Sequence, residues 1–447
     1  MMPLDRRGVA VSLSLGLIAG LALAWVLWRE SRPPPPREPP TAEALRARLA
    51  HAGVNTVQPL STTPPAGPVG VALPQAPPPT AAARPVSYDL SRIAFDAQAG
   101  RYRLAGANGA RLALTLHPAV QRAADGILDG KEVDVGAVVA IEPKTGRVLA
   151  LAERSSSADW KHPALQAMPP AASVFKIVTA AALVEKAGLP ADQPTCFHGG
   201  LHGFNERHLV DNARADTRCE SIAEALGRSS NVVFGKLARK HLDPARLTEV
   251  ARAFGFDKEI PFPLVIESSR VSIPEEPLEY ARAAAGFHHT TLSPMHGALI
   301  AAAIGNGGAM MAPVLVDEAL VGGKPLPAAM PMVIQRVVTD ATARTLTQMM
   351  VTTTELGTAS RYFRKRGPAL QGIAVAGKTG SLSDKDEDGT RRHYSWWVGF
   401  APAENPRIAV AALVVNVTGW RVKSTYIARE VLEAFFAHES GHEVSAR

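Results

Sequence analysis

Ser173 and Lys176 are the two residues whose types and spacing point most directly to chemistry. They form the only Ser-x-x-Lys in the chain, at the start of a strongly apolar stretch that is predicted to be helical. Side chains three residues apart share one face of a helix, so the ammonium can approach the hydroxyl. Apolar neighbours would desolvate the lysine and lower its pKa, which would make it a usable base. Taken alone, however, the same residues are more simply read as a helix-capping serine and a lysine that reaches solvent.

Two further short motifs follow this pair in the chain. Residues 229–231 are the only Ser-x-Asn, and residues 378–380 (Lys-Thr-Gly) end an apolar stretch predicted to be a strand. A glycine at a strand edge allows a substrate backbone to come close. An earlier Lys-Thr-Gly at residues 144–146 lies at a predicted hairpin tip, where turn formation alone explains it. The order, uniqueness and setting of the three motifs are typical of active-site serine acyl-transfer enzymes.

On these motifs the chain resembles the class B penicillin-binding proteins, which are monofunctional D,D-transpeptidases of the serine acyl-enzyme superfamily that includes β-lactamases. The likeness extends from about residue 112 to residue 438. Besides the motifs, it includes four segments: residues 114–121, the hairpin 137–150, residues 292–295 before a helix that ends in Asn-Gly-Gly at 306–308, and residues 397–402.

The resemblance implies a role for each catalytic residue. Ser173 matches the nucleophile that forms the acyl-enzyme, and Lys176 matches its general base. Ser229 matches the relay that carries a proton towards the leaving group. Asn231 matches the side-chain amide that holds the substrate peptide, and Lys378 supplies positive charge.

The resemblance also implies how substrate is bound. Thr379 would bind the terminal carboxylate, Gly380 would let the substrate backbone approach, and the backbone N–H groups of Ser173 and Ser381 would form the oxyanion hole. D-Ala-D-Ala would lose its last residue to Ser173, and an amine of a neighbouring peptidoglycan stem peptide would accept the acyl group. A β-lactam such as penicillin would trap the first step. No cofactor and no metal are expected.

Three alternatives of related chemistry stay open at this point. A D,D-carboxypeptidase or a class D-like serine β-lactamase needs rapid deacylation by water. No Glu-x-x-Asn lies between Asn231 and Lys378, so a deacylating glutamate of the class A kind is not visible, and class D enzymes usually carry an apolar residue where Asn231 stands. A penicillin-binding sensor or scaffold is the third alternative, although intact motifs argue against an inert scaffold.

Around the motifs, the spacing of apolar residues predicts an α+β fold in which helices pack on an antiparallel sheet. Short strands are expected between residues 89 and 115, and a hairpin of strands at 136–142 and 147–152. Three late strands, at 372–378, 394–400 and 407–415, are expected to form a meander, with a further strand at 333–338. Helices are expected at 173–188, 221–240, 244–253, 293–305, 340–355 and 423–436. The resemblance implies the penicillin-binding/β-lactamase-like transpeptidase fold.

Residues 8–28 carry no charge and predict a transmembrane signal anchor. Twenty-one helical residues span roughly 32 Å, the thickness of a bilayer core. A cleaved signal peptide is the alternative, because residues 22–24 (Ala-Leu-Ala) resemble a cleavage site. The seven preceding residues form a short cytoplasmic head, so the bulk of the chain is expected outside the cytoplasm. The predicted location is the bacterial inner membrane, single-pass, with a periplasmic catalytic domain.

The anchor is followed by a linker and then the globular part. Residues 33–85 contain 15 of the 36 prolines, which predicts a Pro/Ala-rich linker over residues 29–85 with one helix candidate at 41–52. The remaining divisions are a small strand segment at 86–112, the transpeptidase domain at 113–438 and a tail at 439–447.

The departures from the family concern partners and local contacts. No glycan-polymerising segment is present, so the resemblance implies a polytopic SEDS-type polymerase as partner. Only about 30 residues stand where class B members usually carry a large pedestal domain, so pedestal-mediated contact is in doubt. The family's usual Gly-Gln-Gly is replaced by Gly-Phe-His-His at residues 286–289, where local substrate contacts are expected to differ.

Cys196 and Cys219 are the only cysteines and would pair outside the cytoplasm. Free buried thiols are one alternative, and a zinc site with His198, His202 and His208 is another, although the spacing fits no standard pattern.

The remaining charged features predict no ligand. The acidic run that begins at Asp384 imitates the start of an EF-hand loop, but Ser395 stands at the twelfth position instead of glutamate, so a solvated loop is expected. The net charge of +7 suits a polyanionic neighbour, and no nucleic-acid-binding pattern accompanies it.

Overall fold

The computed structural model describes residues 89–106, 109–200, 203–326, 329–385, 389–417 and 419–441, all within one compact unit. The predicted head, the anchor at 8–28, the linker and its helix candidate lie outside the described residues, as does most of the tail. Among the helices that are described, none is long and apolar enough to cross a membrane.

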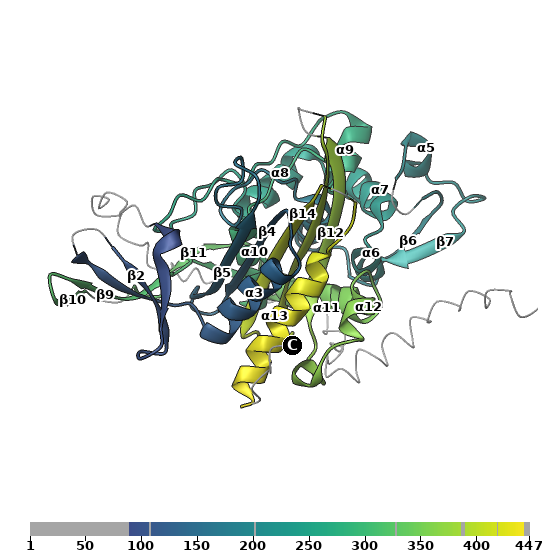
Figure 1. The fold of residues 1–447 in the computed structure, drawn as a ribbon. Coiled ribbons are helices and arrows are strands. Elements are labelled where there is room, and N and C mark those ends of the chain that lie inside the picture. Colours follow the sequence, from purple (N-terminus) through teal and green to yellow (C-terminus); the bar gives the residue numbers. More distant parts are fainter. Residues whose placement is uncertain are drawn as a thin grey trace, which may run out of the picture. The chain divides into compact units, whose positions relative to one another are not determined.

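A five-stranded antiparallel sheet forms the centre of the unit, in the order β12-β13-β14-β4-β5 (Figure 1). Every residue of β14 and β4, two of its three inner strands, is buried, as expected for near-continuous runs of Val, Ala, Ile and Leu. The predicted meander is confirmed, because β12 pairs with β13 and β13 with β14 in antiparallel register. The strands are β12 (Ala376–Lys385), β13 (Arg391–Ala401), β14 (Ile408–Asn416), β4 (Val135–Ile141) and β5 (Val148–Ser155).

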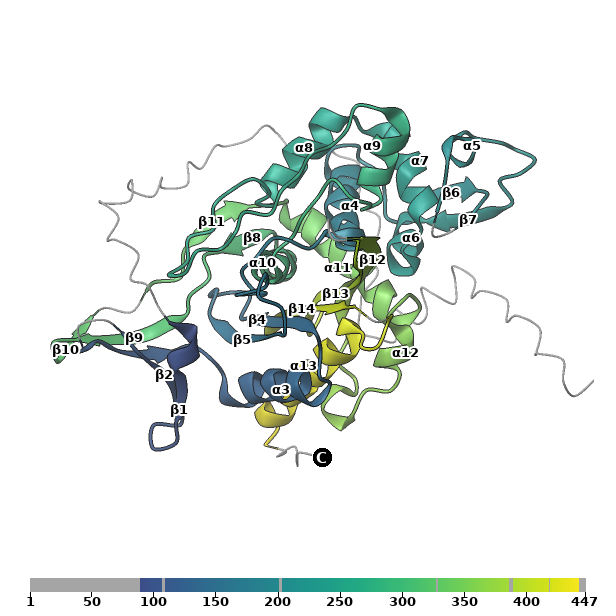
Figure 2. The ribbon, with the colours of Figure 1, turned by 45° about the horizontal axis from the view of Figure 1, so that its top comes forward.

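Helices cover both faces of this sheet (Figure 2). On one face α3 (Pro118–Gly130) packs against α13 (Ser424–Glu439), and both contact the sheet. Their apolar side chains join Trp397 and Val410 in one buried cluster. On the other face α10 (Pro294–Gly305) lies across β14, β13 and β4, with all but its last residue buried. The fold class predicted from the sequence, helices on an antiparallel sheet, is therefore confirmed.

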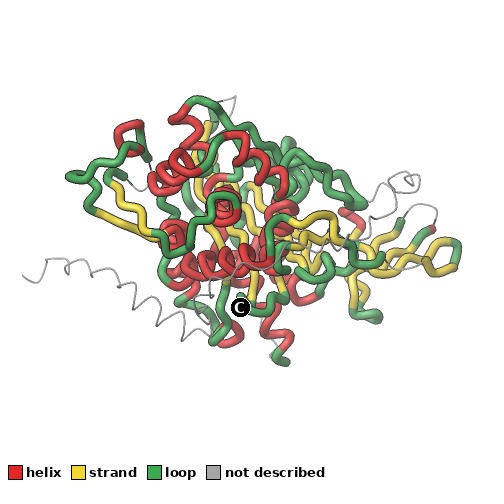
Figure 3. The backbone as a smooth tube through the Cα atoms, turned by 180° about the vertical axis from the view of Figure 1, so that it is seen from behind, coloured by secondary structure: helices red, strands yellow, loops and turns green. Residues whose placement is uncertain are grey.

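Further helices pack around the end of β12 that carries the Lys-Thr-Gly motif. Seen from behind, helices (red) lie in front of the strands (yellow) of the unit (Figure 3). The element that holds Ser173 packs against β12 and continues directly into α4. Helix α11 packs on α6 and β12, and α7 packs on α9. These elements are η3 (Ala172–Phe175), α4 (Lys176–Glu185), α6 (Ile222–Arg228), α7 (Asn231–His241), α8 (Pro244–Ala253), α9 (Pro277–Ala284), α11 (Asp340–Glu355), α12 (Ser360–Phe363) and η4 (Pro368–Leu370).

A second five-stranded sheet joins the start of the described chain to a later hairpin. Its order is β1-β2-β3-β9-β10, and β3 pairs antiparallel with β9 about 200 residues further along the chain. The short strands expected between residues 89 and 115 are therefore present. The elements are η1 (Leu90–Arg92), β1 (Ile93–Asp96), β2 (Arg101–Ala105), β3 (Arg111–Leu114), β9 (Val316–Val321) and β10 (Lys324–Leu326), and a separate pair is formed by β8 (Ala309–Met311) and β11 (Val333–Arg336).

A small hairpin, β6 (Pro194–Phe197) with β7 (Arg218–Ser221), connects α4 to α6 and carries the short helix α5 (Glu206–Leu209) in its loop. Cys196 and Cys219 face each other in the register of this pair and are joined by a disulfide. The hairpin therefore lies between the helix of the Ser-x-x-Lys motif and the helix before the Ser-x-Asn motif.

Two predicted elements differ from the structure in informative ways. The helix expected at 221–240 is two helices, because Ser229 adopts a left-handed conformation (φ 61°) between α6 and α7. The strand expected at 372–378 begins only at Ala376, since Gly372 has a positive φ (75°) and the residues before it form the turn η4. The prediction missed α3 and α9, whose prolines mark their first turns.

The disulfide should contribute measurably to stability. A bridge that closes a loop of this length is worth about 3 kcal/mol by chain entropy, against about 5–15 kcal/mol for the net stability of a domain. Reduction of the purified full-length protein should therefore lower its melting temperature by several degrees in calorimetry. The double variant Cys196→Ser, Cys219→Ser should melt with the reduced protein. Two thiols that can be alkylated without a reductant in protein isolated from membranes would contradict the bridge.

Candidate active site

Lys176 is the first residue of α4, is fully buried, and reaches back to Ser173 in the preceding turn. Its Nζ lies 2.9 Å from Ser173 Oγ, 2.6 Å from Asn231 Oδ1 and 2.5 Å from the Ala285 carbonyl oxygen. The amide and carbonyl oxygens can only accept, so they occupy two N–H bonds of the amine. In a neutral amine the remaining lone pair then faces the Ser173 hydroxyl, which is the arrangement of a base poised to take a proton.

Burial favours that neutral form. The pKa of Lys176 is lowered well below its ordinary value, first because burial desolvates the ammonium and second because the Lys378 ammonium repels it. Apolar side chains supply the burial, among them Phe175, Ile177 and Phe234, whose ring centroid lies 5.9 Å from Nζ. The sequence-based expectation of a desolvated lysine beside the serine thus has a physical basis in the fold.

Lys378 and Ser229 form the opposite side of the site. Lys378 is fully buried in β12, and its Nζ donates to Ser229 Oγ at 3.0 Å and to the Thr379 carbonyl oxygen at 2.8 Å. Burial alone lowers the pKa of Lys378 to about 7. The left-handed turn at Ser229 directs its hydroxyl to this amine, while Asn231 opens the next helix and contacts Lys176. The Ser-x-Asn segment therefore contacts both lysines.

A cavity of about 360 Å³ lies at this site. Ser173, Ser229, Asn231, Thr379 and Ser381 all face it. None of the described residues that line it is acidic. Gly286 and Phe287, from the segment that differs from the family pattern, also line it. The other lining residues were not predicted as site residues: Arg228, Ala285, Thr358, Tyr362, Leu382, Ser383, Ser395, Trp396, Trp420, Lys423 and Thr425.

The substrate-binding edge is held by close packing of β12 against η3. A side chain at Gly380 would place its Cβ 2.9 Å from the Trp396 Cβ and 3.3 Å from Val174, so glycine permits the strand to pass the nucleophile's turn. Thr379 points into the cavity, where its Oγ1 lies 2.6 Å from Thr358 Oγ1. The two hydroxyls together form a small polar corner next to Arg228 in the cavity wall.

The Gly-Phe-His-His segment at residues 286–289 packs against the backbone of Ala172 and Ser173. Gly286 has φ 82° and would place a Cβ 2.2 Å from the Ala172 carbonyl oxygen. Phe287 lines the cavity, whereas His288 lies 3.4 Å from Asp384 and His289 lies 3.2 Å from Glu279. The predicted difference in local contacts therefore concerns Phe287 most directly.

Several of these residues were missed for identifiable reasons. The Ala285 carbonyl carries no side-chain signal, because any residue offers the same oxygen. Arg228 directly precedes the Ser-x-Asn motif, and this adjacency was the one signal available for it. Trp420 and Lys423 lie in the loop after β14, where only the fold brings them to the cleft, and burial lowers the pKa of Lys423 to about 8.

The other sequence candidates lie away from this cavity. His198 and His208 belong to the β6–β7 loop, where their rings contact each other and His198 Nδ1 lies 2.5 Å from Asp216. His202 is outside the described residues. Within the described ranges no group of three or more His, Cys, Asp or Glu side chains is placed to hold a metal ion. Asp384 lies near the end of β12, just before the β12–β13 turn. Residues 386–388 of this turn are not described.

Comparison with known proteins places this geometry in a family. The family model described as the penicillin binding protein transpeptidase domain matches residues 136–436. The chain therefore belongs to the penicillin-binding protein transpeptidase family, as its motifs predicted.

Individual relatives agree with this assignment. The peptidoglycan D,D-transpeptidase PbpA of Mycolicibacterium smegmatis is 29% identical over 339 residues, which are 68% of this chain and 67% of the relative. The penicillin G acyl-enzyme complex of penicillin-binding protein A from M. tuberculosis superposes with a TM-score of 0.60 at 27% identity, covering 72% of this chain and 80% of that one. The D,D-transpeptidase domain of a peptidoglycan glycosyltransferase from Eggerthella lenta superposes with a TM-score of 0.61 at 29% identity, covering 74% of this chain and 83% of that one.

The contact beneath the nucleophile yields a test by substitution. Gly286→Ala would force the Ala172 backbone, and with it Ser173, to move, and would also strain the positive φ. We expect at least tenfold slower acylation by penicillin and a lower melting temperature. Gly372→Ala is the matched control, because Gly372 has a similar φ of 75° but no atom within 4 Å of the added Cβ. Equal acylation defects in the two variants would show that the contact with Ala172 has no role.

Proposed function

We propose that this chain is a peptidoglycan D,D-transpeptidase that cross-links stem peptides in cell-wall synthesis through an acyl-enzyme on Ser173. The predicted activity class is confirmed by the family and by relatives that carry this name. The observation that supports the residue roles best is the position of the buried Lys176 amine between Ser173 Oγ and two oxygens that can only accept.

The acylation half-reaction follows from these contacts. Lys176 takes the proton of Ser173, and the freed Oγ attacks the carbonyl carbon of the penultimate D-Ala. Backbone N–H groups of Ser173 and Ser381 would stabilise the resulting oxyanion. Ser229, which accepts a hydrogen bond from Lys378, would pass its proton to the departing nitrogen and receive in its place the proton that Lys176 took from Ser173, so that Lys176 is neutral again. The peptide bond breaks, the terminal D-Ala leaves as the amine, and an ester to Ser173 is left.

Substrate orientation is assigned to the polar corner of β12. Thr379, whose hydroxyl contacts that of Thr358, would bind the terminal carboxylate, and Lys378, which donates to the Thr379 carbonyl oxygen, would supply a compensating positive charge. Asn231 would hold the peptide through its side-chain amide. Transfer then reverses the chemistry: an amine of a second stem peptide attacks the ester and gives a proton to Lys176. The acyl–Oγ bond breaks, Lys176 returns that proton to Ser173 Oγ, and both groups are restored.

A hydrolytic enzyme needs a group that activates water at the ester. Because neither a histidine nor a carboxylate lines the described cavity wall, the acyl-enzyme lacks the side chains that most often activate water. This favours transfer to an amine over the D,D-carboxypeptidase and serine β-lactamase alternatives. It also gives a long-lived adduct with β-lactams, whose acyl group stays on Ser173.

The same proposal includes the location and division of the chain. Residues 8–28 would form a single transmembrane anchor in the inner membrane, and residues 29–85 a linker that lets the catalytic part act on the wall outside the cytoplasm. The division into a strand segment at 86–112 and a transpeptidase domain at 113–438 is part of this proposal. Because the family domain found here polymerises no glycan, a polytopic SEDS-type polymerase is the proposed partner.

The nucleophile is tested by covalent labelling. A fluorescent penicillin should label the full-length protein once per chain, and the label should persist for many minutes. Ser173→Ala should abolish labelling and leave the melting temperature nearly unchanged, because the hydroxyl lines a cavity and is not part of the apolar core. Full labelling of that variant would overturn the assignment. Release of the label within seconds would instead indicate a β-lactamase.

The base is tested by pH and by one substitution. Acylation should rise with pH as Lys176 loses its proton, and it should fall as Lys378 loses its own. In the empty site burial brings the pKa of Lys378 to about 7, and a bound carboxylate should raise it. The fall of the acylation rate at alkaline pH should therefore occur at higher pH when it is measured at saturating substrate than when the second-order rate constant is measured.

Lys176→Arg should acylate as poorly as Ser173→Ala, because arginine stays protonated at any workable pH and cannot accept the proton. Stopped-flow labelling between pH 5 and pH 10 measures both effects. Retention of most of the acylation rate by the arginine variant would refute the role of Lys176 as base.

A further inference from the structure

Glu220 is a buried acid that belongs to none of the three motifs, yet it contacts residues on both sides of Ser229. Its side chain is 5% exposed, in strand β7 of the disulfide-bonded hairpin. The carboxylate accepts a hydrogen bond from Ser230 Oγ, and its other oxygen lies 3.2 Å from Arg228 Nη1. One carboxylate thus bridges the residue before Ser229 and the residue after it.

Ser229 needs such support because of its backbone conformation. It adopts φ 61° and ψ 39°, a left-handed conformation that is costly for a residue other than glycine. The turn is otherwise fixed by two backbone bonds, from Ser229 N to Leu226 O and from Ser230 N to Ala225 O. This conformation places Ser229 Oγ 3.0 Å from Lys378 Nζ. A small rotation of the turn would move the hydroxyl away from that amine.

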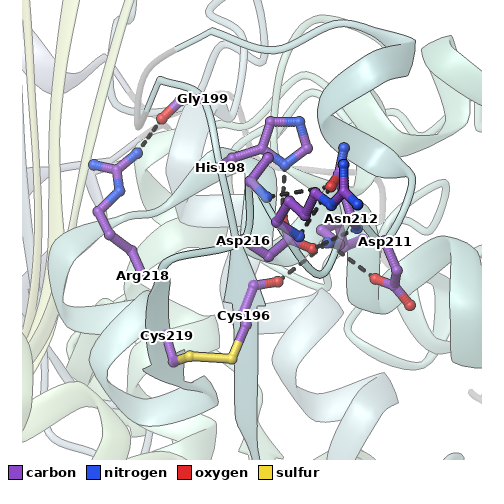
Figure 4. Close-up of polar contacts among 11 residues, drawn as sticks. Cys196, His198, Gly199, Asp211, Asn212, Asp216, Arg218 and Cys219 are labelled. Atoms are coloured by element: carbon purple, nitrogen blue, oxygen red, sulfur yellow. Dashed lines mark hydrogen bonds and ion pairs between the residues drawn. A yellow bond between two sulfur atoms is a disulfide. The ribbon is translucent and has the colours of Figure 1, made fainter.

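The hairpin that carries Glu220 is itself held together by a disulfide and by polar contacts of its loop (Figure 4). Its neighbour Cys219 is bonded to Cys196 across the strand pair. The Cys196 carbonyl oxygen accepts from Lys236 Nζ at 3.1 Å, and Asp216 of the hairpin loop pairs with the same amine at 2.9 Å. Lys236 belongs to α7, the helix that Asn231 begins. The hairpin is therefore attached to both helices that meet at Ser229, through Glu220 to the end of α6 and through Lys236 to α7.

We propose that Glu220 is a positioning residue of the acylation step, which holds the Ser229 turn through Ser230 and Arg228 so that the Ser229 hydroxyl stays on Lys378. This proposal rests on the proposed function, since it assumes that Ser229 relays the proton. Glu220 itself takes no part in proton transfer, because its carboxylate contacts neither Ser173 nor Ser229 among the contacts of the described residues.

Glu220→Ala in the full-length protein removes both contacts at once. Rapid labelling with a fluorescent penicillin over a range of concentrations should show an acylation rate constant reduced about 10- to 100-fold, with little change in the concentration that gives half the maximal rate. That size is expected for the loss of hydrogen bonds to a charged group. Glu220→Gln retains an acceptor for Ser230 and should recover part of the rate. If both variants acylate at the wild-type rate, the proposal is overturned.

Glu224→Ala is the matched control, since this residue lies in the same α6 region and its carboxylate bonds only the backbone N–H of Ser221 in the capping box. It should lower the melting temperature by a few degrees and leave acylation within about threefold of wild type. Reduction of the disulfide should likewise spare the rate, because the β6–β7 backbone pairing keeps Glu220 in place. Defects of equal size in Glu220→Ala and Glu224→Ala would reduce Glu220 to a purely structural role and overturn the proposal.

A double-mutant cycle tests whether Glu220 affects the acylation rate through Ser230. If Glu220 acts through Ser230, adding Ser230→Ala to Glu220→Ala should slow acylation no further, although Ser230→Ala alone should slow it. If the rate reductions of the two single variants instead multiply in the double variant, the two residues act independently and the proposal is contradicted. Failure of the wild-type protein to label at Ser173 would instead refute the proposed function, so the two failures are distinguishable.

Discussion

The burial of one amine is the constraint on which the rest of the site depends. Lys176 can act as a base only when it is neutral, and only a fully desolvated position keeps it so near neutral pH. Its acceptors come from two elements besides its own: Asn231 begins α7, and Ala285 directly follows α9 as its C-cap. The packing of α7 on α9 is therefore a condition for the chemistry as well as for stability.

A second buried amine makes the two lysines unequal. Both are desolvated, and the mutual repulsion of two ammonium groups favours a state in which only one of them is charged. The proposed role of base at Ser173, 2.9 Å away, gives the neutral form to Lys176. Groups whose environments push their pKa values apart can divide the roles of base and cation. The Ser-x-Asn segment contacts both, since Asn231 accepts from Lys176 and Ser229 accepts from Lys378. A single turn thus sets the geometry of both amines.

The sequence predicted what short-range patterns encode. Apolar runs located the central strands, helical periods located α8, α10 and α11 within a residue, and the three motifs converge on one cavity. It did not predict groups without a local signal. The Ala285 carbonyl is a backbone group that every residue has, and Glu220 gains its partners only when the hairpin of residues 194–221 folds back on α6. The break at Ser229 was hidden because a helical pattern continues through it.

Backbone conformation connects the two sides of the site. Ala172, next to the nucleophile, has φ 49°, and Ser229 has φ 61°, so a non-glycine residue in a left-handed conformation stands at each serine. Such conformations persist only where the surroundings determine them. At Ala172 the Gly286 backbone packs against its carbonyl, and at Ser229 the Glu220 carboxylate bridges the flanking residues. Neither Gly286 nor Glu220 belongs to one of the three motifs. The positions of Ser173 and Ser229 therefore depend on two segments outside the motifs: the segment around Gly286 and the β6–β7 hairpin.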